Sequence, residues 1–313
     1  MSVGDNIKRR RYELKMSQQE LADAMGYKTR STIAKIESGE NDVSQRKLQK
    51  FAQVLETTPE ALIGGYARLG GSVHQTRSTG DGENVVVILA GGKSGRNRQN
   101  IPSQFVTVHG KPILVYCMEV YQNHPAIDHI YVVCLRGWEN IVRAYAEEYG
   151  ISKLRDIVPP GSTGMTSLRN GLAHVRTRHR SSDLVIVQEA TRPMVTAETV
   201  SRLLQAGAEK GSATICHSMN EYVQFDISGE NPSYIDRSHV IALQSPEIHR
   251  LSVMEEVFRK AHRLEHPLNE SSFTMLMHNL NFRINFIEST VNNIKITREE
   301  DLAAFSTLLR DTI

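Results

Sequence analysis

The sequence predicts an all-α bundle followed by an α/β domain with a mainly parallel sheet. Three observations support this prediction. Apolar residues recur at helical spacing over residues 1–65, and a stretch rich in Gly, Ser and Thr follows them. Beyond that stretch, short β-branched runs alternate with helical patterns, which is typical of parallel strands connected by helices. At 313 residues the chain is long enough for two domains of this kind.

The bulk composition is that of a globular protein and excludes few functions. Hydrophobic residues make up 40% of the chain and charged residues 23%, while the net charge of +2 argues neither for nor against nucleic acid. No apolar run approaches the ~20 residues that cross a bilayer, so we expect no membrane association. Widely spaced cysteines among apolar neighbours predict buried, reduced thiols, which suit a cytoplasmic protein: Cys117, Cys134 and Cys216.

The first segment carries the signals of short helices joined by tight turns. Ser17 and Glu20 form a capping box that begins one helix, and Gly26 ends it. The next helix is expected to begin near Thr29 and to end before Gly39. Two short helices joined by a glycine turn are typical of a helix-turn-helix. The apolar residues that we expect to face inward are Leu21, Ala22, Met25, Ile33, Ile36, Leu48, Phe51, Ala52 and Leu55.

The run MSQQELADAMGYKTRSTIAKIESGE, residues 16–40, resembles the Cro/repressor-type helix-turn-helix family. The resemblance implies that the helix from Thr29 lies in the major groove of double-stranded DNA, and that the protein is a homodimer reading two half-sites. An alternative interpretation is a helical bundle that binds another protein. The residues implied to contact DNA are Thr29, Arg30, Ser31, Thr32 and Lys35 at the groove, with Ser17 and Gln18 at phosphates.

Residues 66–83 are expected to be a flexible linker, because the stretch is rich in Gly, Ser and Thr and has little apolar patterning. The predicted domains are therefore a helix-turn-helix domain at residues 1–65 and an α/β domain at residues 84–313.

The α/β domain is expected to begin with a buried parallel strand over Val85 to Leu89, because this run is short, apolar and β-branched. A loop with Gly91 and Gly92 follows, and it carries the basic residues Lys93, Arg96 and Arg98. Glycines at a strand end allow a close approach to phosphate, and basic side chains supply counter-charge. An ordinary strand-to-helix turn with solvated cations is the alternative.

Further strands are expected at 130–135, 184–187 and 213–216, with helices at 113–121 and 141–149 between them. In such sheets, ligands bind beyond the carboxyl ends of the strands. The glycine loop and the stretch 188–193 both follow strands, so the sequence predicts a nucleotide pocket where they meet.

A series of motifs runs through nearly all of this segment. They are Ala90-Gly91-Gly92-Lys93-Ser94-Gly95-Arg96, Pro102-Ser103-Gln104, Gly161-Ser162 with Ser167 and Asn170-Gly171-Leu172, Glu189-Ala190-Thr191-Arg192-Pro193, Asp236-Arg237, Gln244-Ser245-Pro246-Glu247 and Asn293-Ile294-Lys295-Ile296-Thr297. Together they resemble the cytidylyltransferases that act on methylerythritol phosphate or ribitol phosphate. The resemblance implies a Rossmann-like nucleotidyltransferase domain with a mainly parallel sheet.

In that family, a substrate phosphate attacks the α-phosphorus of CTP and pyrophosphate leaves, with Mg²⁺ neutralising the triphosphate. The roles implied by the resemblance are catalysis at the transferring phosphate by Arg96 and Lys295, nucleotide binding by Ala90, Gly91, Gly92, Gly161, Ser162 and Ser167, acceptor binding by Glu189, Arg192 and Arg237, and metal binding by Glu189. A structural ion pair is the alternative role for Arg192 and for Arg237.

Several positions depart from the family pattern. Ser103 and Gly164 stand where the family has a lysine and an arginine, while Glu189 and Asn269 each replace an aspartate. Losing one preorganised stabilising group typically costs ~10²–10³ in rate. We therefore favour a DNA-binding transcription regulator whose second domain senses a nucleotide or a sugar or polyol phosphate. An active CTP-dependent cytidylyltransferase with a fused DNA-binding domain is the alternative, and a purely structural dimerisation domain is a third possibility.

Overall fold

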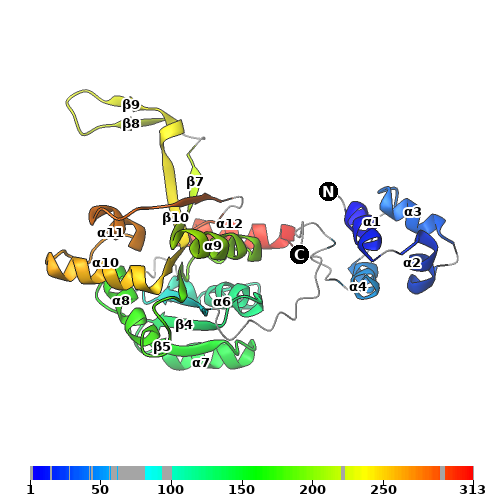
Figure 1. Ribbon diagram of the computed structural model, residues 1–313, viewed down its shortest axis with the longest axis horizontal. Coiled ribbons are helices and arrows are strands. Elements are labelled where there is room, and N and C mark those ends of the chain that lie inside the picture. Colours follow the sequence, from blue (N-terminus) through cyan, green and yellow to red (C-terminus); the bar gives the residue numbers. More distant parts are fainter. Residues whose placement is uncertain are drawn as a thin grey trace. The chain divides into compact units, whose positions relative to one another are not determined.

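The computed structural model describes residues 3–14, 16–27, 29–41, 43, 45–55, 57, 62, 82–93, 101–219, 223–289 and 293–312 (Figure 1). The chain divides into two compact units, Met1–Gly80 and Asp81–Ile313. Most of the predicted linker lies outside the described residues, as does the basic part of the Gly-Gly loop from Ser94 to Asn100.

The described part of the first unit is helical, and its helices follow the predicted order: α1 (Val3–Glu13), α2 (Gln18–Met25), α3 (Ser31–Glu37) and α4 (Gln45–Val54). The predicted capping box is present, because Ser17 Oγ accepts the Glu20 N–H at 3.2 Å and Glu20 Oε2 accepts the Ser17 N–H at 2.7 Å. Gly26 ends α2 with φ 79°, a left-handed conformation that favours glycine. The apolar faces of these helices meet in one core that includes Leu21, Ile33 and Phe51.

A buried ion pair crosses this helical core. Arg11 Nε donates to Glu37 Oε1 at 2.7 Å and Arg11 Nη2 to Glu37 Oε2 at 3.0 Å, with side chains only 4% and 3% exposed. A third bond from Arg11 Nη1 reaches the carbonyl of Met16 at 2.8 Å. The hydrogen bond to Glu37 raises the pKa of Arg11, which keeps the guanidinium charged despite its burial. The pair therefore fastens α1 to α3.

The second unit is built on one sheet of seven strands among the described residues, in the order β11-β7-β10-β6-β1-β4-β5 (Figure 1). Strand β1 lies between β4 and β6 and is parallel to both, while β10 is antiparallel to β6 and β7. The expected mainly parallel sheet is confirmed, and the antiparallel β10 is a feature that the sequence did not predict. The strands are β1 (Asn84–Ala90), β4 (His129–Cys134), β5 (Leu154–Val158), β6 (Leu184–Glu189), β7 (Ser212–Ser218), β10 (Ile241–Arg250) and β11 (Phe286–Glu288).

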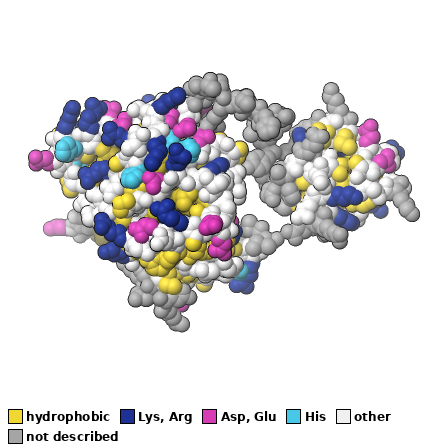
Figure 2. Space-filling view, turned by 90° about the horizontal axis from the view of Figure 1, so that it is seen from below, with side chains coloured by type: hydrophobic (Ala, Val, Ile, Leu, Met, Phe, Trp, Pro, Cys, Tyr) yellow, Lys and Arg dark blue, Asp and Glu magenta, His cyan; other side chains and the backbone are white. Residues whose placement is uncertain are grey.

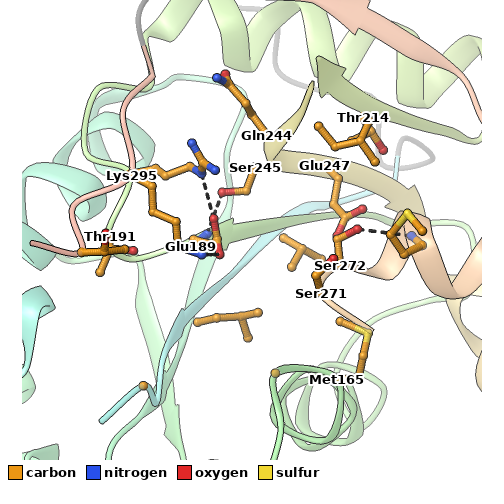
Figure 3. Close-up of a pocket in the computed structure, with 18 of the residues that line it drawn as sticks. Met165, Glu189, Thr191, Thr214, Gln244, Ser245, Glu247, Ser271, Ser272 and Lys295 are labelled. Atoms are coloured by element: carbon orange, nitrogen blue, oxygen red, sulfur yellow. Dashed lines mark hydrogen bonds and ion pairs between the residues drawn. The ribbon is translucent and has the colours of Figure 1, made fainter. Parts of the chain in front are cut away.

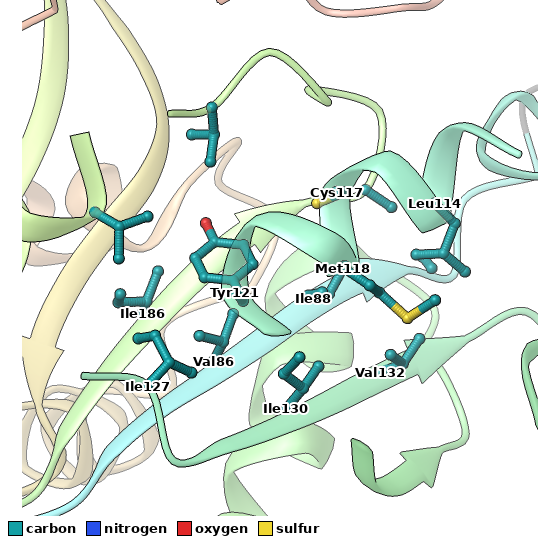
Figure 4. Close-up of a cluster of buried hydrophobic side chains, with 14 of the residues drawn as sticks. Val86, Ile88, Leu114, Cys117, Met118, Tyr121, Ile127, Ile130, Val132 and Ile186 are labelled. Atoms are coloured by element: carbon teal, nitrogen blue, oxygen red, sulfur yellow. The ribbon is translucent and has the colours of Figure 1, made fainter. Parts of the chain in front are cut away.

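Helices cover both faces of this sheet, and the alternation of side chains along β1 decides which residue packs on which face. Val86 and Ile88 point into the cluster that contains Tyr121 (Figure 4), and Val85 and Val87 point into the cluster on the other face. The helices are α6 (Ile113–Asn123), α7 (Glu139–Glu148), α8 (Gly164–Val175), α9 (Ala197–Lys210), α10 (Leu251–Arg263), α11 (Phe273–Asn279) and α12 (Glu299–Thr312).

Short elements complete the unit. A hairpin of β8 (Gln224–Asp226) and β9 (Ser233–Ile235) projects beyond β7 and β10 as an arm (Figure 1), which the sequence did not predict. The arm exposes large apolar side chains, among them Val223 at 73%, Phe225 at 54% and Ile227 at 79%. The remaining elements are β2 (Thr107–Val108), β3 (Lys111–Pro112), η1 (Ser103–Phe105) and η2 (Arg237–His239).

The surface and the thiols agree with the composition. Positive and negative side chains are interspersed over the visible face of the larger unit (Figure 2), in line with the small net charge.

All three cysteines are buried and unpaired, and burial raises the pKa of the Cys134 thiol to about 12. Within the described residues, every helix is too short or too polar to cross a bilayer.

Replacing Glu37 with alanine tests the buried ion pair. Because Glu37→Ala leaves a buried guanidinium without its partner, we expect it to destabilise the first unit by roughly 3–5 kcal/mol. Trp138, the sole tryptophan, lies in the second unit, so its fluorescence follows that unit alone, whereas far-UV circular dichroism follows both. Urea should melt the helical signal of the variant earlier without shifting the Trp138 transition. The matched control is the exposed Glu40→Ala, and a Glu37→Ala variant that unfolds like this control would contradict the ion pair's role.

Candidate functional site

A cavity of about 550 Å³ opens beyond the carboxyl ends of β1 and β6 (Figure 3). Its lining includes Leu89 and Gly92 from the end of β1, Glu189 from the end of β6, and Glu247 from β10. The cavity therefore lies where the sequence predicts a nucleotide pocket, and segments far apart in the chain contribute to it.

The Gly-Gly loop at the end of β1 is held in place by a buried side chain. Gln104, which is 2% exposed, donates its amide to the carbonyls of Ala90 at 2.8 Å and Gly92 at 2.9 Å. A Cβ added to Gly91 would lie 2.7 Å from Pro160, closer than real Cβ contacts come, so this position requires glycine. Phe105, next to Gln104 in η1, stacks on Trp138 with ring centroids 4.2 Å apart. The loop is thus anchored to the hydrophobic core of the unit.

The second predicted nucleotide loop lies beside the first. The N–H of Gly161 donates to Ser167 Oγ at 3.0 Å, and a Cβ on Gly161 would lie 2.3 Å from Thr166 Oγ1. Thr163 caps the N-terminus of α8, and Ser162 is exposed just before it. Backbone N–H groups at a helix N-terminus favour anions. Of the six residues that the resemblance implies for nucleotide binding, Gly92 lines the cavity. Ala90, Gly91, Gly161, Ser162 and Ser167 are not among the described residues that line it, so their role stays a prediction.

A charged cluster occupies the β6 side of the cavity (Figure 3). Glu189 pairs with Lys295 Nζ through Oε1 and with Arg192 Nε through Oε2, the latter at 2.8 Å. Arg192 also donates to the carbonyl of Asn293 at 2.8 Å, and Asn293 donates to the carbonyl of Ser245 at 2.6 Å. Burial raises the pKa of Glu189, but Lys295 and Arg192 outweigh burial, so the net shift is downward. Glu189 is therefore an anion that holds two cations.

The structure does not bring all predicted site residues to the cavity. Arg96 falls outside the described residues. Arg237 lies in η2 near the arm, is exposed, and is not among the described residues that line the cavity. Lys93 is exposed and also does not line it. The predicted roles of Arg96 and Arg237 stay predictions.

The departures from the family pattern have different structural settings. Ser103 lies in η1 and is 4% exposed. As a serine it carries no charge, so it does not replace the lysine of the family pattern. Gly164 lines the cavity, and a Cβ at this position would meet nothing within 4 Å. Asn269 is exposed between α10 and α11. The space beside Gly164 is where a longer side chain would enter the cavity.

The sequence motif Gln244-Ser245-Pro246-Glu247 did not predict that Glu247 lines the cavity as a buried carboxylate. This carboxylate is 4% exposed, lines the cavity, and accepts the N–H groups of Phe273 at 3.0 Å and Thr274 at 2.9 Å. Its partners come from α11, which no motif marked. The signal available in the sequence was an acid, Glu247, within the segment that forms β10, because a buried acid needs hydrogen-bond partners and is therefore a candidate site residue.

In the helical unit, the outer surface of α3 carries the residues predicted to read DNA. Thr29, Arg30, Ser31 and Lys35 are exposed and Thr32 is half-buried. The buried residues of α3 are Ile33, Ile36 and Glu37. This arrangement leaves a basic, hydroxyl-rich helix surface open to a partner.

The two residues predicted to hold phosphates behave differently from each other. Ser17 caps α2 and is exposed. Gln18 Nε2 instead donates to Glu37 Oε2 at 2.9 Å, so its side chain is already engaged within the unit. This bond uses one of the two N–H donors of the amide, and the predicted phosphate contacts of Ser17 and Gln18 stay predictions.

Comparison with known proteins bears on both units. Residues 84–311 match the family model described as 2-C-methyl-D-erythritol 4-phosphate cytidylyltransferase, and residues 7–62 match a helix-turn-helix model. A ribitol-5-phosphate cytidylyltransferase of Lacticaseibacillus paracasei is 30% identical over 229 residues, covering 72% of this chain and 98% of that protein. A 2-C-methyl-D-erythritol 4-phosphate cytidylyltransferase of Clostridium botulinum is 28% identical, covering 70% and 94%.

Solved structures share the fold. The 4-diphosphocytidyl-2C-methyl-D-erythritol synthase of Anaerococcus prevotii aligns with a TM-score of 0.62 at 18% identity, covering 73% of this chain and 96% of that one. The 2-C-methyl-D-erythritol 4-phosphate cytidylyltransferase of Thermus thermophilus aligns with a TM-score of 0.57 at 20% identity, covering 73% and 99%. Both resemblances drawn from the sequence are confirmed. The chain belongs to the 2-C-methyl-D-erythritol 4-phosphate cytidylyltransferase family, and it carries a helix-turn-helix domain at residues 7–62.

Proposed function

We propose that the protein is a cytoplasmic, DNA-binding transcription regulator whose cytidylyltransferase domain binds CTP, or a related nucleotide or sugar phosphate, as its signal. One observation carries the proposal. The cavity keeps its Gly-Gly loop and the Glu189–Arg192–Lys295 cluster, while Ser103 and Gly164 leave it without two cations of the family pattern. Because each lost stabilising group costs ~10²–10³ in rate, such a pocket keeps binding better than turnover.

The DNA-binding part rests on α3. Its exposed residues Thr29, Arg30, Ser31 and Lys35 include two cations, and Glu37, the acid of this helix, is buried against Arg11. The outward surface therefore presents positive charge and hydroxyls, which suit phosphates and the base edges of the major groove. A protein-binding bundle would more commonly expose an apolar patch at this place.

We further propose that the protein acts as a homodimer. A domain of this type reads one half-site, so a pair of copies reads a palindromic operator. The arm supports this proposal, because Val223, Phe225, Ile227 and Tyr234 are more than half exposed, at 73%, 54%, 79% and 59%. Apolar side chains gathered on a projecting hairpin are typical of an interaction surface.

Ligand binding in the cavity rests on charge. Lys295 and Arg192 are positioned by Glu189, and both line the cavity, so a phosphate group entering it meets two cations in fixed places. Mg²⁺ in nucleotide sites takes one or two carboxylates plus the substrate's phosphates, and we propose Glu189 as the carboxylate. Both of its oxygens are paired with Lys295 and Arg192, so the ion would have to displace one of these cations. When bound, Mg²⁺ would neutralise part of the triphosphate charge.

A second candidate function is an active cytidylyltransferase that also binds DNA. It is favoured by the complete Glu189–Arg192–Lys295 cluster and by relatives named ribitol-5-phosphate cytidylyltransferase that are 30% identical. In that reaction, an oxygen of the acceptor's phosphate attacks the α-phosphorus of CTP, and the bond to pyrophosphate breaks. Lys295 and Arg192 would stabilise the charge that develops on the phosphoryl oxygens.

DNA binding and its control by nucleotide form the first test. An operator is selected from random double-stranded DNA with the full chain, and its affinity is measured by fluorescence anisotropy at fixed salt. We expect Arg30→Ala to weaken binding roughly 10-fold or more, because it removes a groove contact, while the exposed Lys210→Ala in α9 removes one charge without effect. We expect CTP with Mg²⁺ to shift operator affinity at least ~5-fold. An operator affinity that CTP and polyol phosphates leave unchanged would refute the regulator.

The Lys295→Ala variant tests the cavity. It removes one of two cations, so calorimetry should give a CTP affinity lower by roughly 10- to 100-fold. Lys111→Ala is the matched control, because Lys111 also pairs with a glutamate, Glu119 at 2.6 Å, away from the cavity. Equal CTP affinity in both variants would place the nucleotide elsewhere. Binding of no nucleotide or sugar phosphate by the wild-type chain would leave only a dimerisation role.

Turnover separates the two candidates. Pyrophosphate release from CTP is measured with ribitol 5-phosphate and other polyol phosphates as acceptors. We expect little release from the wild type and at least ~10-fold more from Gly164→Arg, because the space beside this glycine admits a cation into the cavity. Gly164→Met, similar in reach but uncharged, is the control. Wild-type release at a rate ordinary for enzymes, a few turnovers per second or more, would establish the second candidate instead.

A further inference from the structure

A cluster of histidines and carboxylates lies at the opposite edge of the sheet from the cavity. Glu83 precedes β1, His129 begins β4, and Asp183 precedes β6, while His179 comes from the turn that follows α8. Parallel neighbouring strands begin at the same edge, so residues distant in sequence meet here. Nothing in the chemistry of the cavity uses this cluster.

The atoms of this cluster converge on one point. His179 Nδ1 lies 2.7 Å from Glu83 Oε2 and 3.7 Å from Asp183 Oδ2, and one ligand atom from each of the three residues lies within 4.8 Å of the others. His129 Nε2 lies 3.7 Å from the other oxygen of Glu83, and the two imidazole rings are 5.3 Å apart. Both imidazoles therefore lie against Glu83, and His179 also lies beside Asp183.

The central side chains are held in place by the surrounding structure. Asp183 accepts the N–H of Glu83 at 3.0 Å and the N–H of Arg180 at 2.9 Å. The other ring nitrogen of His179 lies 2.9 Å from the hydroxyl of Tyr131, whose side chain is fully buried. A histidine bound to a metal through one nitrogen usually donates the N–H of the other to such a partner. Only 2% of His179 and of Asp183 is exposed, whereas Glu83 is 46% and His129 29% exposed.

We propose that Glu83, His179 and Asp183 bind a divalent transition-metal ion such as Zn²⁺, and that His129, which lies beside Glu83, turns toward the ion to complete the site. Bond lengths of ~2.0–2.2 Å to nitrogen and oxygen in a tetrahedral site put neighbouring ligand atoms about 3.3–3.6 Å apart. The distances of 2.7 Å and 3.7 Å from His179 lie on either side of this value, so small side-chain shifts form the site. The solvent-exposed sides of Glu83 and His129 give the ion an entry path.

The donor set selects the class of metal. Imidazole nitrogen suits zinc and its first-row neighbours, while Mg²⁺ and Ca²⁺ prefer oxygen ligands. The site is therefore distinct in chemistry from the magnesium proposed for the cavity. Binding would fasten the first residues of the second unit to the start of β6, since Glu83 and Asp183 are 100 positions apart. The ion would thus stabilise the fold of this unit and take no part in nucleotide chemistry.

The test uses the full chain without an affinity tag, stripped of metal and free of nucleotide. Zn²⁺ affinity is measured by competition with a chromophoric chelator. We expect one tightly bound ion per chain, a Zn²⁺ affinity lower by at least ~100-fold for His179→Ala, and one lower by ~10- to 100-fold for Tyr131→Phe, which keeps the ring but removes the hydroxyl beside His179 Nε2. His174→Ala is the matched control, because His174 Nδ1 also pairs with a carboxylate, Asp156 at 3.0 Å, and neither residue belongs to the cluster.

A second variant guards against misfolding. Glu83→Gln changes a side chain that is 46% exposed, so it should fold normally by circular dichroism while losing Zn²⁺ affinity. Zn²⁺ should raise the melting temperature reported by Trp138 in the wild type and in His174→Ala, and Mg²⁺ should not. A wild-type chain that binds less than one Zn²⁺ ion at micromolar Zn²⁺ would overturn the proposal. Equal Zn²⁺ affinity in the wild type, His179→Ala and Glu83→Gln would overturn it as well.

Discussion

The parallel pairing of β1 with β4 on one side and β6 on the other determines where the chemistry of the second unit lies. All three strands run in one direction, so their carboxyl ends meet at one edge of the sheet and their amino ends at the other. The cavity with Gly92 and Glu189 belongs to the first edge, and the cluster around His179 belongs to the second. A shift of one residue in the register of β1 would move each of its core side chains to the opposite face of the sheet. Such a shift would disrupt both the cavity and the cluster around His179.

A carboxylate that holds cations recurs in the two units with different consequences. Glu37 fixes Arg11 in the helical core, where both side chains are buried and the pair joins α1 to α3. Glu189 fixes Arg192 and Lys295 at the wall of a cavity, where the same arrangement leaves cation surface open to a ligand. Without Glu189 the two cations would repel each other, so this acid both neutralises and orients them. An entering phosphate competes with a partner that is already well placed.

The core strands and the short helices could be predicted from the sequence because their signals are local. The β-branched run before Ala90 and the capping box at Ser17 depend only on neighbouring residues. The antiparallel strand β10 could not, because Gln244 to Glu247 interrupt its apolar pattern and its partners lie far away in the chain. The site divides in the same way. The glycine loops could be recognised from their own residues. The hydrogen bond from Gln18 to Glu37 and the position of Arg237 could not be predicted, because both depend on tertiary packing.

The stacking of Phe105 on Trp138 gives the chain a built-in optical probe. Phe105 follows Gln104, whose amide holds the backbone at Ala90 and Gly92, so the indole reports on the wall of the cavity through one short segment. Emission from an indole depends on what surrounds its ring. A ligand that displaces this segment is therefore expected to change the emission of the unlabelled chain, since this indole is the only one in the sequence.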